Sequence, residues 1–124
     1  MKKVLLVLAI LFICGCEEQG QGSAGEVLGF LDSPHTVDLK EPLTGDLGGK
    51  TITDDRTIIY YHNVSLLEVK DYIDSIKDKF PTNQSVIDNY DSANLYKFTA
   101  ESDSFYLILM LENYTFTIDV RYKL

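Results

Sequence analysis

The chain offers few side chains that could carry out acid–base or nucleophilic chemistry. It has two histidines, His35 and His62, and His62 stands three residues before Ser65. A histidine beside a serine hydroxyl could form part of a catalytic triad. Ser65, however, begins a Ser-Leu-Leu-Glu sequence that ends at Glu68 and is typical of a capping box at a helix N-terminus. We therefore expect His62 to close a strand and Ser65 to open a helix, and we predict that the protein is not an enzyme.

Oxygen ligands for a metal ion are concentrated in one stretch, which contains Asp88, Asp91 and Asn94. Carboxylate and amide oxygens are the ligands that calcium prefers. The spacing lacks the alternating acidic residues of a calcium-binding loop, and no glycine follows Gly49. A solvated loop with turn-forming residues explains the stretch better. We predict no metal site and no cofactor, with a small metal-dependent envelope enzyme as the alternative.

Three N-x-S/T sequons occur, at Asn63, Asn83 and Asn113, although the chain has only five asparagines. Such sequons are acceptors for N-glycosylation in organisms that possess the machinery. Asparagine is also a common turn residue, because it tolerates left-handed backbone conformations. These three residues are therefore candidate modification sites with an alternative explanation as turn residues.

The charge and the cysteine count exclude several classes of protein. The 124 residues carry a formal net charge of -8, with 19 acidic and 11 basic residues. A chain this acidic repels phosphate backbones, so we expect no nucleic-acid partner. Two cysteines are too few for a disulfide-dense scaffold or for a zinc site with four cysteine ligands.

The N-terminus is organised like a secretion signal. Lys2 and Lys3 precede an unbroken apolar run over residues 4–13, and small residues follow. Residues 4–16 would form a helix about 20 Å long, whereas a bilayer core of about 30 Å requires roughly 20 residues. The segment is therefore too short for a stable membrane span.

The end of this segment, Ile13-Cys14-Gly15-Cys16, resembles the lipobox of prokaryotic lipoproteins. The resemblance implies that Cys16 is linked to diacylglycerol and that residues 1–15 are a signal peptide that is removed. Cys14 occupies a position where the family usually has Ala or Ser, but it is small. Removing Lys2 and Lys3 leaves 9 basic and 19 acidic residues, so the mature charge would be -10. Its single cysteine would be acylated, which excludes cysteine catalysis.

A change in composition divides the rest of the chain. All eight glycines lie at or before residue 49, and all eight tyrosines lie at residue 60 or later. Glycine raises the entropy lost on ordering, whereas tyrosine supplies packing area. We therefore predict a Gly-rich tether and extended segment over residues 16–50, with one short strand near residues 36–40. The folded domain is predicted over residues 51–124.

Periodicity predicts an α+β fold in the order β-α-β-β-β, with one helix packed on an antiparallel meander sheet. The first strand is expected at residues 57–62. An apolar stripe at helical spacing predicts a helix that starts after Ser65 and ends before Pro81. Residues 82–92 are expected to form a loop, with a possible short strand at 85–87. The predicted meander strands cover residues 93–100, 105–111 and 114–124.

Residues 105–111 are apolar on both faces of their strand, although the chain offers only one strong helix to cover them. If Phe105, Leu107, Leu109 and Leu111 face the helix, the other face carries Leu95, Tyr106, Ile108 and Met110. Either residues 27–40 or a protein partner could cover this face.

The order of strand, capped helix and meander is similar to that of many small prokaryotic lipoproteins without an assigned activity. This similarity of pattern does not identify any functional residue in the present chain. We expect a lipid-anchored, extracytoplasmic binding or accessory module of the cell envelope. Its membrane attachment would be the diacylglycerol on Cys16. A purely structural envelope component is a further alternative.

Overall fold

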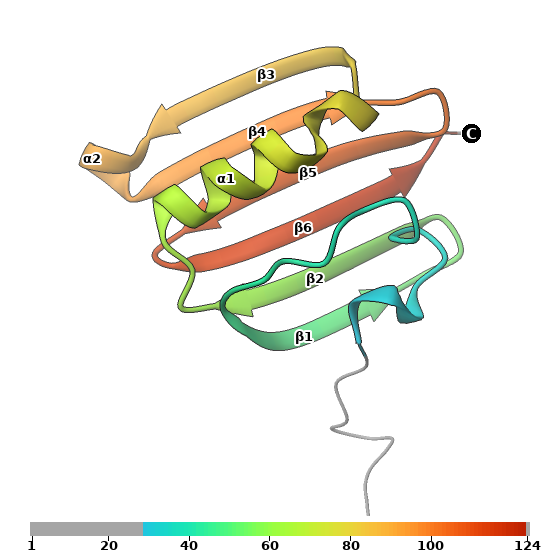
Figure 1. Ribbon diagram of the computed structural model, residues 1–124, viewed down its shortest axis with the longest axis horizontal. Coiled ribbons are helices and arrows are strands. Elements are labelled where there is room, and N and C mark those ends of the chain that lie inside the picture. The colour runs from blue at the N-terminus through green and yellow to red at the C-terminus, as the bar shows by residue number, and fades with distance from the viewer. Residues whose placement is uncertain (1–28, 124) are drawn as a thin grey trace, which may run out of the picture.

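The computed structural model describes residues 29–123, which form one antiparallel sheet of six strands with a helix across one face (Figure 1). The signal peptide, Cys16 and most of the predicted tether lie outside the described residues. The strands lie side by side in the order β1-β2-β6-β5-β4-β3. Their bounds are Asp46–Ile52 (β1), Arg56–His62 (β2), Thr82–Asn89 (β3), Leu95–Glu101 (β4), Phe105–Glu112 (β5) and Thr115–Tyr122 (β6).

The α+β class and the packing of one main helix on an antiparallel sheet are confirmed. The predicted order β-α-β-β-β is incomplete, because the chain runs β1-β2-α1-β3-β4-β5-β6. The helical elements are α1 (Leu66–Ile76), a short α2 (Tyr90–Ala93) and two 3-10 turns, η1 (Phe30–Asp32) and η2 (Lys77–Lys79). None of the helices described within residues 29–123 is long and apolar enough to cross a membrane.

Helix α1 begins with the predicted capping box. The Ser65 N–H donates to the Glu68 carboxylate at 2.8 Å, and the Glu68 N–H donates to the Ser65 hydroxyl at 3.3 Å. These bonds satisfy two donors that a helix N-terminus otherwise leaves without a partner. The buried face of α1 consists of Val69, Tyr72, Ile73 and Ile76.

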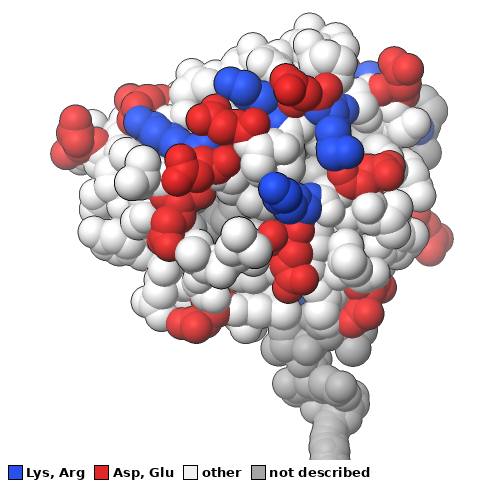
Figure 2. Space-filling view, viewed as in Figure 1, with Lys and Arg blue, Asp and Glu red and all other residues white. Residues whose placement is uncertain are grey.

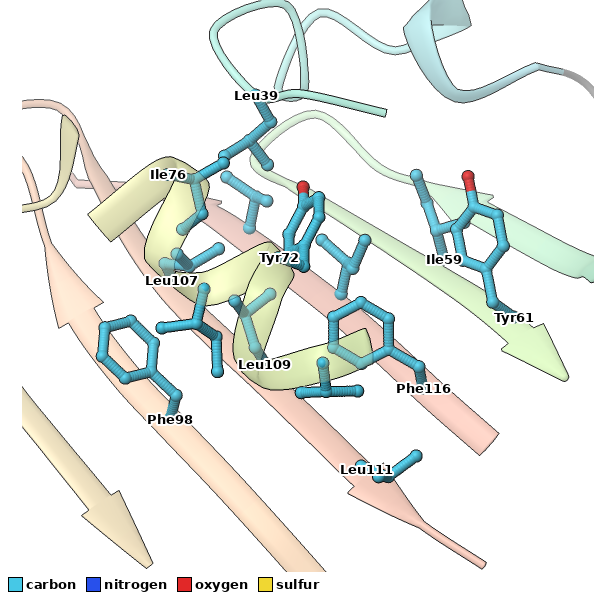
Figure 3. Close-up of a cluster of buried hydrophobic side chains, with 14 of the residues drawn as sticks. Leu39, Ile59, Tyr61, Tyr72, Ile76, Phe98, Leu107, Leu109, Leu111 and Phe116 are labelled. Atoms are coloured by element: carbon cyan, nitrogen blue, oxygen red, sulfur yellow. The ribbon is translucent and has the colours of Figure 1, made fainter. Parts of the chain in front are cut away.

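The hydrophobic core lies between α1 and the sheet (Figure 3). Strand β5 contributes Leu107, Leu109 and Leu111, which are essentially inaccessible to solvent, and Phe116 of β6 packs edge-on against Tyr72. Burial of each such side chain stabilises the fold by about 1.5–3 kcal/mol. The predicted inward-facing residues of β5 are therefore the centre of the core.

The N-terminal segment, which we define as residues 30–44, packs on the same face of the sheet as α1 (Figure 1). Phe30 and Leu39 belong to the core, and the Tyr72 hydroxyl donates to the Lys40 carbonyl at 2.6 Å. The predicted strand at residues 36–40 is wrong, since turns occupy these positions. The Thr36 hydroxyl stabilises them by donating to the Phe30 carbonyl at 2.7 Å.

The predicted boundary at residue 50 falls inside β1, because this strand runs from Asp46 to Ile52. Its glycines are not tether residues. A Cβ atom on Gly48 would overlap the exposed His62 ring, so a larger residue here would require that ring to move. Gly45 has a positive φ of 87°, which favours glycine.

The stretch expected to be mainly loop contains a full strand, β3, at the edge of the sheet. All eight of its residues are exposed, so it lacks the burial pattern by which strands are usually recognised in a sequence. Its pairing with β4 matches Val86 with Phe98 and Ile87 with Lys97.

Candidate docking face

The sheet face opposite α1, which we call the open face, carries the four predicted docking residues. Tyr106 is 46% exposed, and Leu95, Ile108 and Met110 are half-buried. Because side chains alternate along a strand, Tyr106, Ile108 and Met110 of β5 point away from the buried leucines of the same strand. The described part of residues 27–40 does not cover this face, since it packs on the α1 side.

Two neighbouring strands extend the apolar surface. Asp119 of β6 lies opposite Ile58 on one side and opposite Ile108 on the other. In the next row, Thr117 of β6 separates Tyr60 from Met110. Cross-strand neighbours of this kind are close enough for their side chains to interact. The open face therefore presents aromatic and aliphatic groups of β2 and β5 on either side of the polar Thr117 and Asp119 of β6.

An ionic cluster lies within this surface. Arg56 binds Asp119 through two bonds, from Nε to Oδ1 at 3.0 Å and from Nη2 to Oδ2 at 2.8 Å. Nη2 of Arg121 also contacts Asp119 Oδ2, at 3.3 Å. Asp119 is only 6% exposed, whereas the arginines are partly open to solvent. The hydrogen bond to Asp119 raises the pKa of Arg56. These are the only two arginines of the chain.

A second pair lies at the end of the same face. The Lys123 ammonium contacts Glu101 Oε1 at 2.9 Å, and the Asn83 amide donates to Glu101 Oε2 at 2.9 Å. The hydrogen bond from Asn83 lowers the pKa of Glu101 most, and the bond from Lys123 lowers it further. Lys123 also lies over the Tyr106 ring, 5.3 Å from its centre. Between the two ionic groups is a shallow hollow lined by Asn83, Thr99, Glu101, Tyr106, Ile108 and Arg121.

Figure 2 shows the side of the molecule that carries α1, opposite the open face. Acidic side chains lie across the whole visible face, whereas lysines gather in its upper half, near α1. Two of these lysines have acidic partners: Lys77 lies 3.2 Å from Asp74, and Lys70 lies 3.8 Å from Asp88. Exposed pairs of this kind contribute little to stability.

The residues considered for catalysis are not assembled into a site. Ser65 is engaged in the capping box, and the His62 ring lies 3.4 Å from the Thr115 hydroxyl. The other histidine, His35, is buried. Its Nε2 donates to the Asp54 carbonyl at 3.3 Å, and its Nδ1 shares a hydrogen bond of 2.6 Å with the Thr57 hydroxyl.

The Thr57 hydroxyl is in turn bonded to Ser33 at 2.5 Å. This chain of hydroxyl and imidazole groups resembles a nucleophile and its base in connectivity. All three side chains are closed to solvent, however, with Ser33, His35 and Thr57 at most 2% exposed. Their hydrogen bonds hold the N-terminal segment against β2. The sequence reasoning missed this cluster, because its members are far apart in the chain.

The oxygen ligands considered for a metal are also divided among other partners. Asp88 accepts from the Tyr90 N–H at 3.3 Å, and the Asn94 amide donates to Asn113 at 3.2 Å. Within residues 29–123, no three His, Cys, Asp or Glu side chains lie close enough together to hold a metal ion.

The three sequon asparagines occupy left-handed turn positions, with φ of 62° at Asn63, 52° at Asn83 and 51° at Asn113. Asparagine adopts this conformation more readily than most residues. The Asn63 amide also donates to Asp46 at 2.6 Å. Turn geometry therefore accounts for these asparagines, and their glycosylation stays a prediction.

A separate cavity of about 210 Å³ lies between residues 40–44 and α1, with Val64 and Phe116 among its lining residues. Two of the polar groups beside it already have partners, because Glu68 is held by Ser65 and Tyr72 by Lys40. The open face remains the stronger candidate, since several of its donors and apolar groups are free.

No protein family, curated protein or solved structure matches this chain significantly. Inferences about its function therefore rest on its own residues.

Proposed function

We propose that this protein is a binding or accessory module of the cell envelope, anchored by diacylglycerol on Cys16 at the extracytoplasmic side of the membrane. We further propose that the open face docks a protein partner. The observation that supports docking is the row of exposed and half-buried apolar groups at Tyr106, Ile108 and Met110, which no described part of the chain covers. A binding role fits better than catalysis, because the described serine and histidine candidates serve structural hydrogen bonds.

The anchor is tested by Cys16→Ser. Without a thiol the diacylglycerol cannot be attached, so we expect release of the protein from membranes or accumulation of an unprocessed precursor. Membrane fractionation and intact-mass spectrometry measure both. Retention in the membrane at the mature mass would show that Cys16 is not the anchor.

The docking face is tested by Ile108→Lys. Ile108 is half-buried and lies opposite Asp119 and Thr99, so a lysine there can extend its ammonium into solvent while placing a charge in the docking surface. We expect this variant to keep the fold and lose partner capture by a photoreactive group introduced at position 106. Circular dichroism and cross-linking in cells measure the two effects.

Leu67→Lys is the matched control, because Leu67 is an exposed apolar residue of α1, away from the open face. This variant should keep both the fold and the cross-link. Unfolding caused by Ile108→Lys would mean that the residue belongs to the core, and equal loss of capture in both variants would mean that the open face has no special role.

A further inference from the structure

We infer that the open face recognises a carboxylate flanked by apolar side chains, as in an acidic segment of a protein partner. This inference rests on the proposed docking function and names the chemistry of the partner. It starts from the ionic cluster, in which two guanidinium groups share the single carboxylate of Asp119. The cluster therefore carries one net positive charge on a chain whose net charge is -8.

The guanidinium of Arg121 carries N–H groups that are not used in the contact with Asp119. A guanidinium has five N–H groups. Arg56 is held on Asp119 by Nε and Nη2, whereas Arg121 contacts it through Nη2 alone. Within residues 29–123, Nε and Nη1 of Arg121 make no hydrogen bond, and its bond to Asp119 comes from Nη2. The planar arrangement of these donors suits a two-point interaction with a carboxylate.

The surroundings of Arg121 favour an apolar neighbour for that carboxylate. Arg121 lies opposite Tyr106 on β5, and both line the shallow hollow together with Ile108. The acid that lines the hollow, Glu101, is already neutralised by Lys123. A ligand that enters the hollow therefore meets the guanidinium of Arg121, which contacts Asp119 through Nη2 alone, beside an aromatic ring and an aliphatic side chain.

These features distinguish a peptide from other anionic partners. Attachment to an anionic membrane generally requires a cluster of about 4–8 basic residues. Nucleic-acid binding depends on neutralising several phosphates at once. The basic residues of the open face are offset by acids, with Arg56, Arg121, Lys97 and Lys123 on one side and Asp119, Glu101 and Glu112 on the other. The face as a whole therefore carries little net charge and meets neither requirement. A second copy of this chain docked face to face about an axis through the cluster would bring the two arginine clusters together, which like charge disfavours.

The test uses the purified full chain and a short fluorescent peptide in which Glu alternates with Leu, capped at both ends. A second peptide replaces every Glu by Gln. Fluorescence anisotropy should show binding of the Glu peptide and binding weaker by about tenfold or more for the Gln peptide. Arg121→Gln should weaken binding of the Glu peptide by a similar factor, because it leaves the two-point Arg56–Asp119 interaction in place.

Lys77→Gln is the control, because it removes a positive charge on the opposite side of the molecule and should leave binding unchanged. Thermal unfolding checks that both variants are folded. Equal affinity for the two peptides, or an equal effect of the two variants, would overturn carboxylate recognition. Binding of phosphatidylglycerol vesicles that is lost in Arg121→Gln, without binding of the Glu peptide, would also overturn it in favour of a lipid headgroup.

Failure of this inference can be distinguished from failure of the docking proposal. If cross-linking from position 106 depends on Ile108 but is unaffected by Arg121→Gln, the open face docks a partner without recognising a carboxylate. If Ile108→Lys leaves the cross-link intact, the docking proposal itself is wrong.

Discussion

Two buried tyrosines beneath the N-terminal segment allow a matched test of how this segment is held. The Tyr72 hydroxyl donates to the Lys40 carbonyl at 2.6 Å, whereas the Tyr61 hydroxyl is buried without a partner among the described residues. Their rings lie in the same core, and both hydroxyls are visible in Figure 3. Replacement of each tyrosine by phenylalanine removes one oxygen and keeps the ring.

Tyr72→Phe should lower the free energy of unfolding by about 0.5–1.5 kcal/mol, the net contribution of a typical hydrogen bond. For a folded unit of this size, 1 kcal/mol corresponds to a shift of about 4–8 °C in the melting temperature, so the expected decrease is about 2–12 °C. Tyr61→Phe should leave the melting temperature unchanged or raise it, because it removes a hydroxyl whose burial is not compensated by a bond.

Denaturant titration and calorimetry of the two variants measure these changes. A loss of stability in Tyr61→Phe as large as in Tyr72→Phe would refute the reasoning, since it would mean that the Tyr61 hydroxyl makes a stabilising bond. No change in Tyr72→Phe would mean that the contact between Tyr72 and Lys40 does not hold the N-terminal segment.

Two further predictions concern the helix cap and the tyrosines at high pH. Ser65→Ala should lower the free energy of unfolding by about 0.5–2 kcal/mol in a denaturant titration, and no measurable loss would mean that the capping box does not stabilise α1. Burial raises the pKa of Tyr61 to about 12 from its ordinary value of 10.0. The stability linked to its neutral form is therefore complete below pH 10.0 and lost as the pH rises through about 12. The ultraviolet absorbance of tyrosinate, compared between the wild type and Tyr61→Phe, measures the pH at which Tyr61 ionises. Ionisation of all tyrosines near pH 10.0 in the folded protein would contradict the raised pKa.

The elements that could be predicted from the sequence are those with local signals. Helix α1 carries both its capping box and its apolar stripe within a single stretch of chain. Strand β5 is identified by its unbroken run of apolar residues, and the alternation in β6 predicts which side chains turn inward. In each case the deciding interactions lie within a few residues of one another.

The elements that were missed depend on distant partners. Strand β1 is rich in glycine and is held by its pairing with β2, and the fully exposed β3 is held by its pairing with β4. Polar and glycine-rich composition at these positions is equally typical of loops. Residues 27–40 were expected as one possible cover of the sheet, but nothing local to this segment indicated that Phe30 and Leu39 pack on the α1 side.

The candidate site divides in the same way. Alternation along β5 was enough to place Tyr106, Ile108 and Met110 on one face. Arg56 and Asp119 are 63 residues apart, and only the register between β2 and β6 brings them together. Asp119 stands between apolar residues that alternate along β6, and this alternation indicates its face but not its partner.

The position of Asp119 is difficult to explain by stability alone. It lies in β6, between β2 and β5, where Ile58 and Ile108 are its cross-strand neighbours. An apolar residue would suit that environment, and replacing a buried ion pair by apolar residues is often neutral or stabilises a protein by about 1–4 kcal/mol. The carboxylate does, however, hold Arg56 in a fixed position and orient Arg121 beside Tyr106. Because apolar residues could fill this place in the sheet, we propose that the two guanidinium groups held by Asp119 serve the recognition of an anionic group.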